Sequence, residues 1–343
     1  MKRLSLSGCL VLVAVCTFTA LAAVGSSGYH LIKSISLGDS NWTWDFQTID
    51  ERARRLYISH FNEVLVLDVD SGKIVGTIPD TPGVHGVAIA PKVGHGFVSV
   101  GKRSSALIFD LKTLAKIDEV PVGANPDAII YDPATERIFS FNGDSSDATA
   151  IESATGKVAG TFKIDGKPEF AVSDGKGFVY LDLVDKNVVA KIDARKLEVV
   201  SRWLTAPCDR PTSMAADLQN QRLFVGCRNL MMAVLDISTG HFVAQAPIGD
   251  NVDTTVFDPG TRFVSSSTGD GVITIIHQDS ADKYSSVEIV KTHDGSKTMA
   301  LDSKSHRLFV PSGDVRFLPA ETKDGRPKKT IAPGTFAIRV YGK

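Results

Sequence analysis

Acidic residues recur at one position of a repeated strand pattern. Most copies of this strand end in Asp or Pro, at Asp50, Pro91, Asp132, Asp174, Asp217, Asp258 and Asp302. Five residues before these ends stand, in the same order, Asp45, Gly86, Asp127, Glu169, Thr212, Asp253 and Lys297, and His85 is next to Gly86. Carboxylates held close together repel one another, so the pKa of at least one should rise unless a cation intervenes.

Such a group of side chains is compatible with three kinds of site. The carboxylates are solvated or cap loops, or they bind a ligand, or they form a metal or catalytic centre. Oxygen ligands suit Ca²⁺ or Mg²⁺, and one His together with carboxylates suits a transition metal. The candidate metal ligands are Asp45, Asp127, Glu169 and Asp253, and the candidate counter-ions are Lys297, Arg228 and protonated His85.

The loops that follow the second strand of each repeat add further polar side chains. Antiparallel pairing brings these loops to the same end as the start of the first strand. The loop candidates are His60, Asn142, Arg228 and Asp270. The predicted ligand-binding site combines them with Asp45, His85, Asp127, Glu169, Asp253 and Lys297.

The repeat that positions these residues occurs seven times. A polar or Gly residue followed by strand-forming residues begins each copy, at Arg55, Gly96, Arg137, Gly177, Arg222, Arg262 and Arg307, 40, 41 or 45 residues apart. Each copy contains four strand-like runs, as in "HGVAIA", "GFVSV", "ALIFDL" and "AKIDEVPV". The first two are mostly apolar and the fourth alternates, which is typical of buried and outer strands.

This periodicity predicts an all-β fold, a seven-bladed β-propeller of four-stranded antiparallel blades in one domain over residues 24–343. The innermost strands line the axis, so the recurring acidic position forms a ring at one mouth of the central channel. "YHLIKSISLG" (29–38) matches a fourth strand and "TFAIRVYG" (335–342) matches a third. We therefore expect the N-terminal strand to complete the last blade and close the ring.

The segment 311–335 interrupts this last blade and is rich in Pro, Lys and Gly. We interpret it as a long loop that is either mobile or a lid over the channel mouth. As a lid it would turn five basic residues toward the acidic ring: Arg316, Lys323, Arg326, Lys328 and Lys329.

Several stretches carry a family resemblance. "VLVLDVDSGKIVGTI", the turn Gly123-Ala-Asn-Pro126, "HGVAIAP", "NPDAI" and "RLFVGCRN" resemble the YVTN-repeat propellers, the YncE-like exported bacterial proteins, over residues 29–343. The resemblance implies a propeller fold and export, and it says little about activity. The repeated Gly-His and Trp-Asp pair of WD40 proteins is missing, and the three Trp residues do not repeat as in quinone-dependent dehydrogenase propellers.

The first 23 residues have the features of a secretory signal peptide. Lys2 and Arg3 precede an apolar run that ends in small residues, with cleavage expected after Ala22 or Ala23; a retained membrane anchor is the alternative. We expect a periplasmic or secreted protein with no membrane span after cleavage. Loss of Lys2 and Arg3 reduces 38 basic residues to 36 against 39 acidic ones, so no basic field for nucleic acid is expected.

Two of the four cysteines, Cys9 and Cys16, leave with the signal peptide. An oxidising compartment then favours a disulfide between Cys208 and Cys227. The alternative is a pair of free thiols that act in redox chemistry or metal binding.

The leading functional hypothesis is a monomeric, exported binding or interaction propeller without a firmly implied cofactor. A small ligand, cation or protein partner would engage the channel mouth. The second hypothesis is a metal-assisted hydrolase or lactonase, in which the carboxylates hold the ion and His85 or His60 moves protons. No nucleophile elbow occurs in the sequence, so serine hydrolase chemistry is not indicated.

Overall fold

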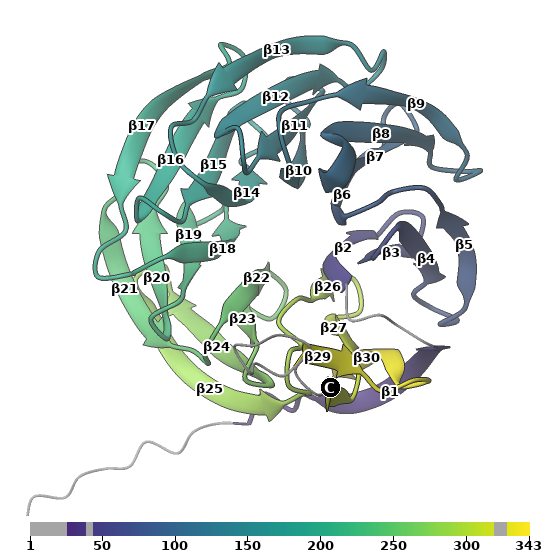
Figure 1. The fold of residues 1–343 in the computed structure, drawn as a ribbon. Coiled ribbons are helices and arrows are strands. Elements are labelled where there is room, and N and C mark those ends of the chain that lie inside the picture. The colour runs from purple at the N-terminus through teal and green to yellow at the C-terminus, as the bar shows by residue number, and fades with distance from the viewer. Residues whose placement is uncertain (1–25, 39–43, 319–327) are drawn as a thin grey trace, which may run out of the picture.

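The computed structural model describes residues 26–38, 44–318 and 328–343. Seven four-stranded antiparallel sheets are arranged around a central axis (Figure 1). The chain is therefore a seven-bladed β-propeller, as the repeat predicts. The predicted signal peptide, residues 1–23, lies outside the described part of the chain.

The first six blades each consist of four consecutive strands, numbered outward from the axis. Blade 1 contains β2 (Trp44–Asp50), β3 (Arg55–His60), β4 (Glu63–Asp68) and β5 (Ile74–Ile78). Blade 2 contains β6 (Val84–Ala90), β7 (His95–Val100), β8 (Ser105–Asp110) and β9 (Lys116–Pro121). Blade 3 contains β10 (Pro126–Asp132), β11 (Arg137–Asn142), β12 (Asp147–Glu152) and β13 (Val158–Lys163).

Blades 4 to 6 repeat this order. Blade 4 contains β14 (Pro168–Ser173), β15 (Phe178–Leu183), β16 (Val188–Asp193) and β17 (Glu198–Leu204). Blade 5 contains β18 (Pro211–Asp217), β19 (Arg222–Cys227), β20 (Met231–Asp236) and β21 (Phe242–Pro247). Blade 6 contains β22 (Val252–Asp258), β23 (Phe263–Thr268), β24 (Val272–Ser280) and β25 (Lys283–Lys291).

Blade 7 joins the two ends of the chain. Its strands, from the axis outward, are β26 (Ala300–Asp302), β27 (Arg307–Ser312), β30 (Phe336–Gly342) and β1 (His30–Gly38). Strand β1 pairs antiparallel with β30 and places Ile35 opposite Ile338. The prediction that the N-terminal strand closes the ring is confirmed.

The hydrophobic core is divided among the interfaces between neighbouring blades. Phe97 and Ile108 of blade 2, for example, pack in one cluster with Ile138 and Ile151 of blade 3, and all four are buried. Each blade therefore needs a neighbour on both faces, which explains why a closed ring is the stable arrangement. The recurring strand-end Asp residues cap turns, as expected: Asp50 accepts hydrogen bonds from the backbone N–H groups of Arg52 and Ala53, both at 3.0 Å.

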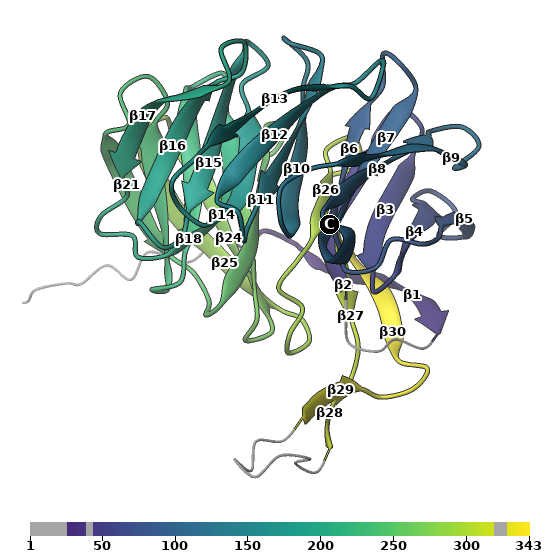
Figure 2. The same ribbon diagram turned by 45° about the horizontal axis from the view of Figure 1, so that its top comes forward.

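The insertion in blade 7 is more regular than expected. Strands β28 (Val315–Leu318) and β29 (Lys328–Ile331) pair antiparallel and form a hairpin. The hairpin extends away from the disc (Figure 2), and Figure 1 places it over blade 7 and not over the channel axis. Residues 319–327, which include Lys323 and Arg326 of the predicted lid, lie outside the described part of the chain.

Helical structure in the described residues is limited to one 3-10 turn, Gly101–Arg103. None of these residues forms a helix of the length and apolar character needed to cross a membrane.

Candidate functional site

The ring residues lie at irregularities in the innermost strands. In β2 the pairing with β3 shifts between Trp44 and Gln47, so that Asp45 and Phe46 form a β-bulge. Equivalent register shifts occur in β6, β10, β14, β18 and β22. A bulge turns a side chain out of the regular alternation of a strand, so the bulges present the ring positions to the channel mouth.

The register of blade 2 differs by one residue from the sequence-based alignment. Strand β6 ends at Ala90, which pairs with His95, and not at Pro91. The residue five positions before Ala90 is His85, so His85 and not Gly86 occupies the ring position. The sequence had placed His85 only beside the ring.

Three ring residues of successive blades form a close group. The Nδ1 atom of His85 lies 2.7 Å from Oδ2 of Asp45 and 3.7 Å from Oδ1 of Asp127. The side chains of Asp45, His85 and Asp127 are 28%, 29% and 22% exposed, so water reaches all three. One ligand atom from each lies within 4.8 Å of the others, a spacing that suits a divalent metal ion.

Burial and mutual charge shift the pKa values of His85 and Asp127. Burial alone would lower the pKa of His85, but its hydrogen bond to Asp45 and the nearby carboxylates raise it from 6.5 to about 9. Burial raises the pKa of Asp127 to about 7, and the negative charges of Asp45 and Glu169 add to this effect against the opposing charge of His85. The pKa rise predicted from the sequence therefore occurs at Asp127, with burial as its main cause and carboxylate repulsion as a smaller one.

The other side of the ring contains its own cations. Asp253 is 7% exposed, with Nη2 of Arg228 at 2.9 Å, and it also forms an ion pair with Lys297. Glu169 has Lys167 at 3.8 Å and Arg228 at 4.0 Å. Burial raises the pKa of Asp253 and of Glu169, and these cations oppose the increase.

The four carboxylates proposed as metal ligands are therefore divided into two sets. Asp45 and Asp127 lie with His85, whereas Asp253 is bound by Arg228 and Lys297. Among the described residues, the cluster with metal-ligand spacing contains one nitrogen and two carboxylate donors. This donor set suits a transition metal better than Ca²⁺ or Mg²⁺, which prefer oxygen ligands.

Two phenylalanines divide the channel beyond the ring. Phe46 of blade 1 and Phe170 of blade 4 meet with ring centroids 5.3 Å apart and planes at 66°. The cavity on one side of this pair has a volume of about 470 Å³ and is lined by β2, β6, β10 and β14. The cavity on the other side has a volume of about 360 Å³ and is lined by β2, β14, β18, β22 and the region around β26.

This aromatic partition was not predicted from the sequence. The available signal was that an aromatic residue directly follows a ring carboxylate in only two places, Asp45-Phe46 and Glu169-Phe170. The contact between the two side chains crosses the channel from blade 1 to blade 4, and the spacing of the repeat does not show how close those two strands lie.

A fully buried carboxyl group lies next to the ring. Asp182 of β15 stands opposite the bulge that contains Glu169, and neither of its carboxyl oxygens has a hydrogen-bond partner among the described residues. Burial raises its pKa well above the usual range, and the charge of Glu169 adds to the shift.

Three predicted site residues have other contacts. His60 stacks on Phe336, with ring centroids 5.0 Å apart. Asn142 is buried and donates hydrogen bonds to Asp147 and Thr149 within blade 3. Asp270 accepts a hydrogen bond from the backbone N–H of Asp250 and so caps a loop. The contacts of these residues are to their own blades and loops or to blade 7.

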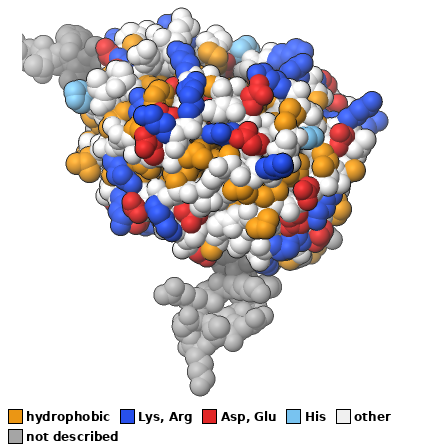
Figure 3. Space-filling view, turned by 90° about the horizontal axis from the view of Figure 1, so that it is seen from above, with side chains coloured by type: hydrophobic (Ala, Val, Ile, Leu, Met, Phe, Trp, Pro, Cys, Tyr) orange, Lys and Arg blue, Asp and Glu red, His pale blue; other side chains and the backbone are white. Residues whose placement is uncertain are grey.

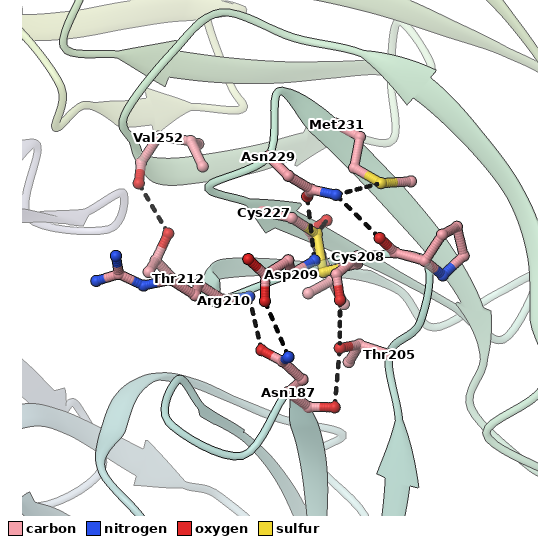
Figure 4. The surroundings of a disulfide bond; sticks show 12 residues. Asn187, Thr205, Cys208, Asp209, Arg210, Thr212, Cys227, Asn229, Met231 and Val252 are labelled. Carbon is pink, nitrogen blue, oxygen red and sulfur yellow. Dashed lines mark hydrogen bonds between the residues drawn. A yellow bond between two sulfur atoms is a disulfide. The ribbon is translucent and has the colours of Figure 1, made fainter.

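Cys208 and Cys227 form a disulfide (Figure 4), as predicted. The bridge links the segment before β18 to the end of β19 across 19 residues. In the chain-entropy view, closing such a loop contributes about 3 kcal/mol. Asn187 of the preceding blade bonds to Asp209 and Arg210 beside the bridge, so the disulfide anchors a loop that faces the neighbouring blade.

Comparisons with known proteins support the architecture. No family model and no curated protein sequence matches the chain. Solved structures that are similar include a chain from a crystal structure of the mitotic checkpoint complex, with a TM-score of 0.70 and 14% identity over 97% of this chain and 99% of that one. The structure of U3-55K gives a TM-score of 0.73 and 10% identity over 90% and 97% of the two chains.

The crystal structure of RRP9 WD40 repeats is also similar, with a TM-score of 0.73 and 11% identity over 93% of this chain and 99% of that one. The shared feature is the propeller fold. Sequence identities of 10–14% show a shared fold and no shared function. The resemblance to YVTN-repeat propellers stays a prediction.

Proposed function

We propose that this chain is an exported, YVTN-type binding propeller whose ligand engages the polar mouth of the central channel. The observation that carries the proposal is the group of Asp45, His85 and Asp127. Three blades converge there on partly exposed, charged side chains, and the pKa values of His85 and Asp127 are shifted. Perturbed titratable groups on a concave surface are a common property of binding sites.

Two further features favour binding over a purely structural role. A rigid ring of sheets holds the mouth residues in place, and function in such folds is carried by side chains set on the scaffold. One similar solved structure comes from a complex, so the same scaffold occurs there within an assembly. The face drawn in Figure 3 mixes both signs of charge with hydrophobic side chains, which favours a small ligand or protein partner over nucleic acid.

A ligand screen by thermal unfolding tests the proposal. The mature protein is mixed with libraries of small cations, anions, metal ions and neutral metabolites. We expect at least one class to raise the melting temperature of the wild type and not that of the variant Asp45→Asn. The matched control is Asp118→Asn, which removes an exposed acid from the outer strand of blade 2. If every stabilising compound acts equally on all three proteins, the mouth is not the binding site.

The donor set at the mouth also keeps a second candidate function open, a metal-assisted hydrolase or lactonase. Asp45, His85 and Asp127 would hold a divalent ion, given the spacing of their ligand atoms. Such an ion, when bound, polarises a carbonyl group and lowers the pKa of water. Elemental analysis of the purified protein and melting with and without chelator test this alternative. Stoichiometric metal whose removal lowers stability would favour it, and indifference to chelator would favour the binding function.

A further inference from the structure

The larger of the two channel cavities has walls and a rim of different chemistry. The residues that line it begin at Phe46, Gly86, Ala128 and Phe170. Each of these directly follows a ring residue, namely Asp45, His85, Asp127 and Glu169. The cavity of blades 1 to 4 therefore starts one residue below three carboxylates and one imidazole, and its walls are mainly apolar and aromatic.

The smaller cavity has a rim of opposite character. Its nearest ring residues include Asp253, which Arg228 and Lys297 bind as ion pairs. Glu169 stands at the boundary between the cavities and has Lys167 and Arg228 within 4.0 Å. The acidic side of the mouth is thus the side above the larger cavity.

Two acceptors near the larger cavity receive no hydrogen bond from the described residues. The carboxylate of Asp127 lies in the rim above the cavity, accepts no hydrogen bond from them, and has His85 as an ion-pair partner at 3.7 Å. Gln47, which is 9% exposed and lines both channel cavities, donates through Nε2 to Thr298 and to the carbonyl of Asp45. Its amide oxygen has no partner within the part of the chain that the structure describes. A ligand that fits must supply donors or positive charge.

We propose that the larger cavity binds a small organic ammonium ion with an apolar tail. The ammonium group lies among Asp45, Asp127 and Glu169, and the tail extends along Phe46 and Phe170 into the apolar part of the cavity. A volume of about 470 Å³ is sufficient for a ligand of this size. Aromatic faces attract cations and also pack against apolar chains. The side chains of Phe46 and Phe170 therefore favour a ligand that has both an ammonium group and an apolar tail. The inference rests on the proposed function and specifies the ligand of the same mouth.

The test uses isothermal titration of the mature protein with n-hexylammonium above neutral pH, where Asp127 is ionised. The neutral probe is 1-hexanol and the anionic probe is hexanoate. We expect hexylammonium to bind at least tenfold more tightly than either, since one partly buried ion pair contributes a factor of about ten. Asp127→Asn should weaken binding about tenfold.

The matched control is Asp118→Asn on the outer strand of blade 2. Because Asp118 is exposed and lies outside the predicted site, this variant should change hexylammonium affinity less than twofold. Circular dichroism checks that each variant is folded. The conservative variant Asp127→Glu keeps the charge and should retain most of the affinity, which separates a charge effect from a folding defect.

The outcomes separate the ligand class from the proposed function. Equal binding of all three probes, preference for hexanoate or hexanol, or an equal loss in Asp127→Asn and Asp118→Asn would overturn the ammonium inference. Absence of hexylammonium binding would also overturn it. In each case the proposed binding function would still be tested separately by the ligand screen. In that screen, loss of stabilisation in Asp45→Asn identifies any ligand that binds at the mouth.

Discussion

Phe46 and Phe170 meet edge to face across the central channel, with ring centroids 5.3 Å apart, although they belong to blades 1 and 4. Because each follows a ring carboxylate, this contact fixes the distance between two sides of the mouth. It also separates the cavity below Asp45 and Asp127 from the cavity on the side of Asp253, which cations bind. The proposed ammonium ligand would therefore enter on the side of Asp45 and Asp127.

Removing the aromatic side chain of Phe46 or of Phe170 should destabilise the fold, and the effects of the two substitutions should not be additive. Both side chains are partly exposed, so we expect Phe46→Ala and Phe170→Ala each to cost about 1–3 kcal/mol. Their double-mutant cycle in urea unfolding should give a coupling of about 0.5–1.5 kcal/mol, the value of an aromatic pair. Phe242→Ala on the exposed outer strand β21 is the control, with an expected change near zero. Strict additivity of the two variants would show that the rings do not interact.

The raised pKa of Asp127 predicts a pH-dependent gain of stability on neutralisation. Burial raises this pKa from 3.8 to about 7, so the group favours the folded state most below pH 3.8, and this contribution is lost as the pH rises through 7. Asp127→Asn removes the cost of ionisation. We expect the variant to be more stable than the wild type at pH 8, and this advantage to shrink by about 1.4 kcal/mol for each pH unit between pH 7 and pH 5, because over that range the wild-type carboxyl group regains its proton in the folded state alone.

Urea unfolding between pH 5 and pH 8 measures this difference. Asp118→Asn, at an exposed position, should show no such change between pH 5 and pH 8. If Asp127→Asn is less stable than the wild type at pH 8, the carboxylate contributes favourable contacts and the predicted repulsion is wrong.

Asp182 should be replaceable with a gain in stability. The equivalent position opposite the bulge of blade 2 is Ser99, whose hydroxyl donates to the carbonyl of Asp127 at 2.8 Å. Asp182 is buried without a partner among the described residues, so Asp182→Ser should stabilise the protein by roughly 1–3 kcal/mol at pH 8. The reverse exchange, Ser99→Asp, should destabilise it by a similar amount. Thermal unfolding of both variants provides the comparison, and a large loss in Asp182→Ser would point to an unrecognised role of the carboxyl group.

If β1 closes the ring, its buried side chains should contribute more to stability than its exposed ones. Ile35 is 8% exposed and packs in one cluster with Ile58, Phe309 and Ile338 of blades 1 and 7. Ile35→Ala should therefore cost about 2–4 kcal/mol. Leu31→Ala, on the same strand but 48% exposed, should cost less than about 0.5 kcal/mol. Equal effects in chemical unfolding would mean that β1 does not hold the ring closed.

The sequence was sufficient to predict the blades because their signal is periodic. The strand-forming runs that begin at Arg55 and at six later positions gave the number of blades, and the alternation in each fourth run marked the outer strand. The ring position followed from the same register, since Asp45, Asp127, Glu169 and Asp253 all lie at bulges of innermost strands.

The details that the repeat could not give depend on contacts without periodicity. The pairing of β6 determines that His85 occupies the ring, whereas the sequence alignment used Pro91 and selected Gly86. Arg228 and Lys297 were predicted as counter-ions of the ring, but their pairing with Asp253 joins residues of blades 5, 6 and 7, and no spacing assigns them to that carboxylate. The stacking of His60 on Phe336 of blade 7 is likewise a contact that the repeat does not encode.

The measurement that tests the central claim most directly is a crystal structure of the mature protein with 6-bromohexylammonium, in which the anomalous signal of bromine locates the tail of the ligand. The account predicts one bromine site in the larger cavity beside Phe46 and Phe170, with the ammonium group near Asp127. A bromine site in the smaller cavity below Asp253, or on the outer wall of the blades, would contradict it.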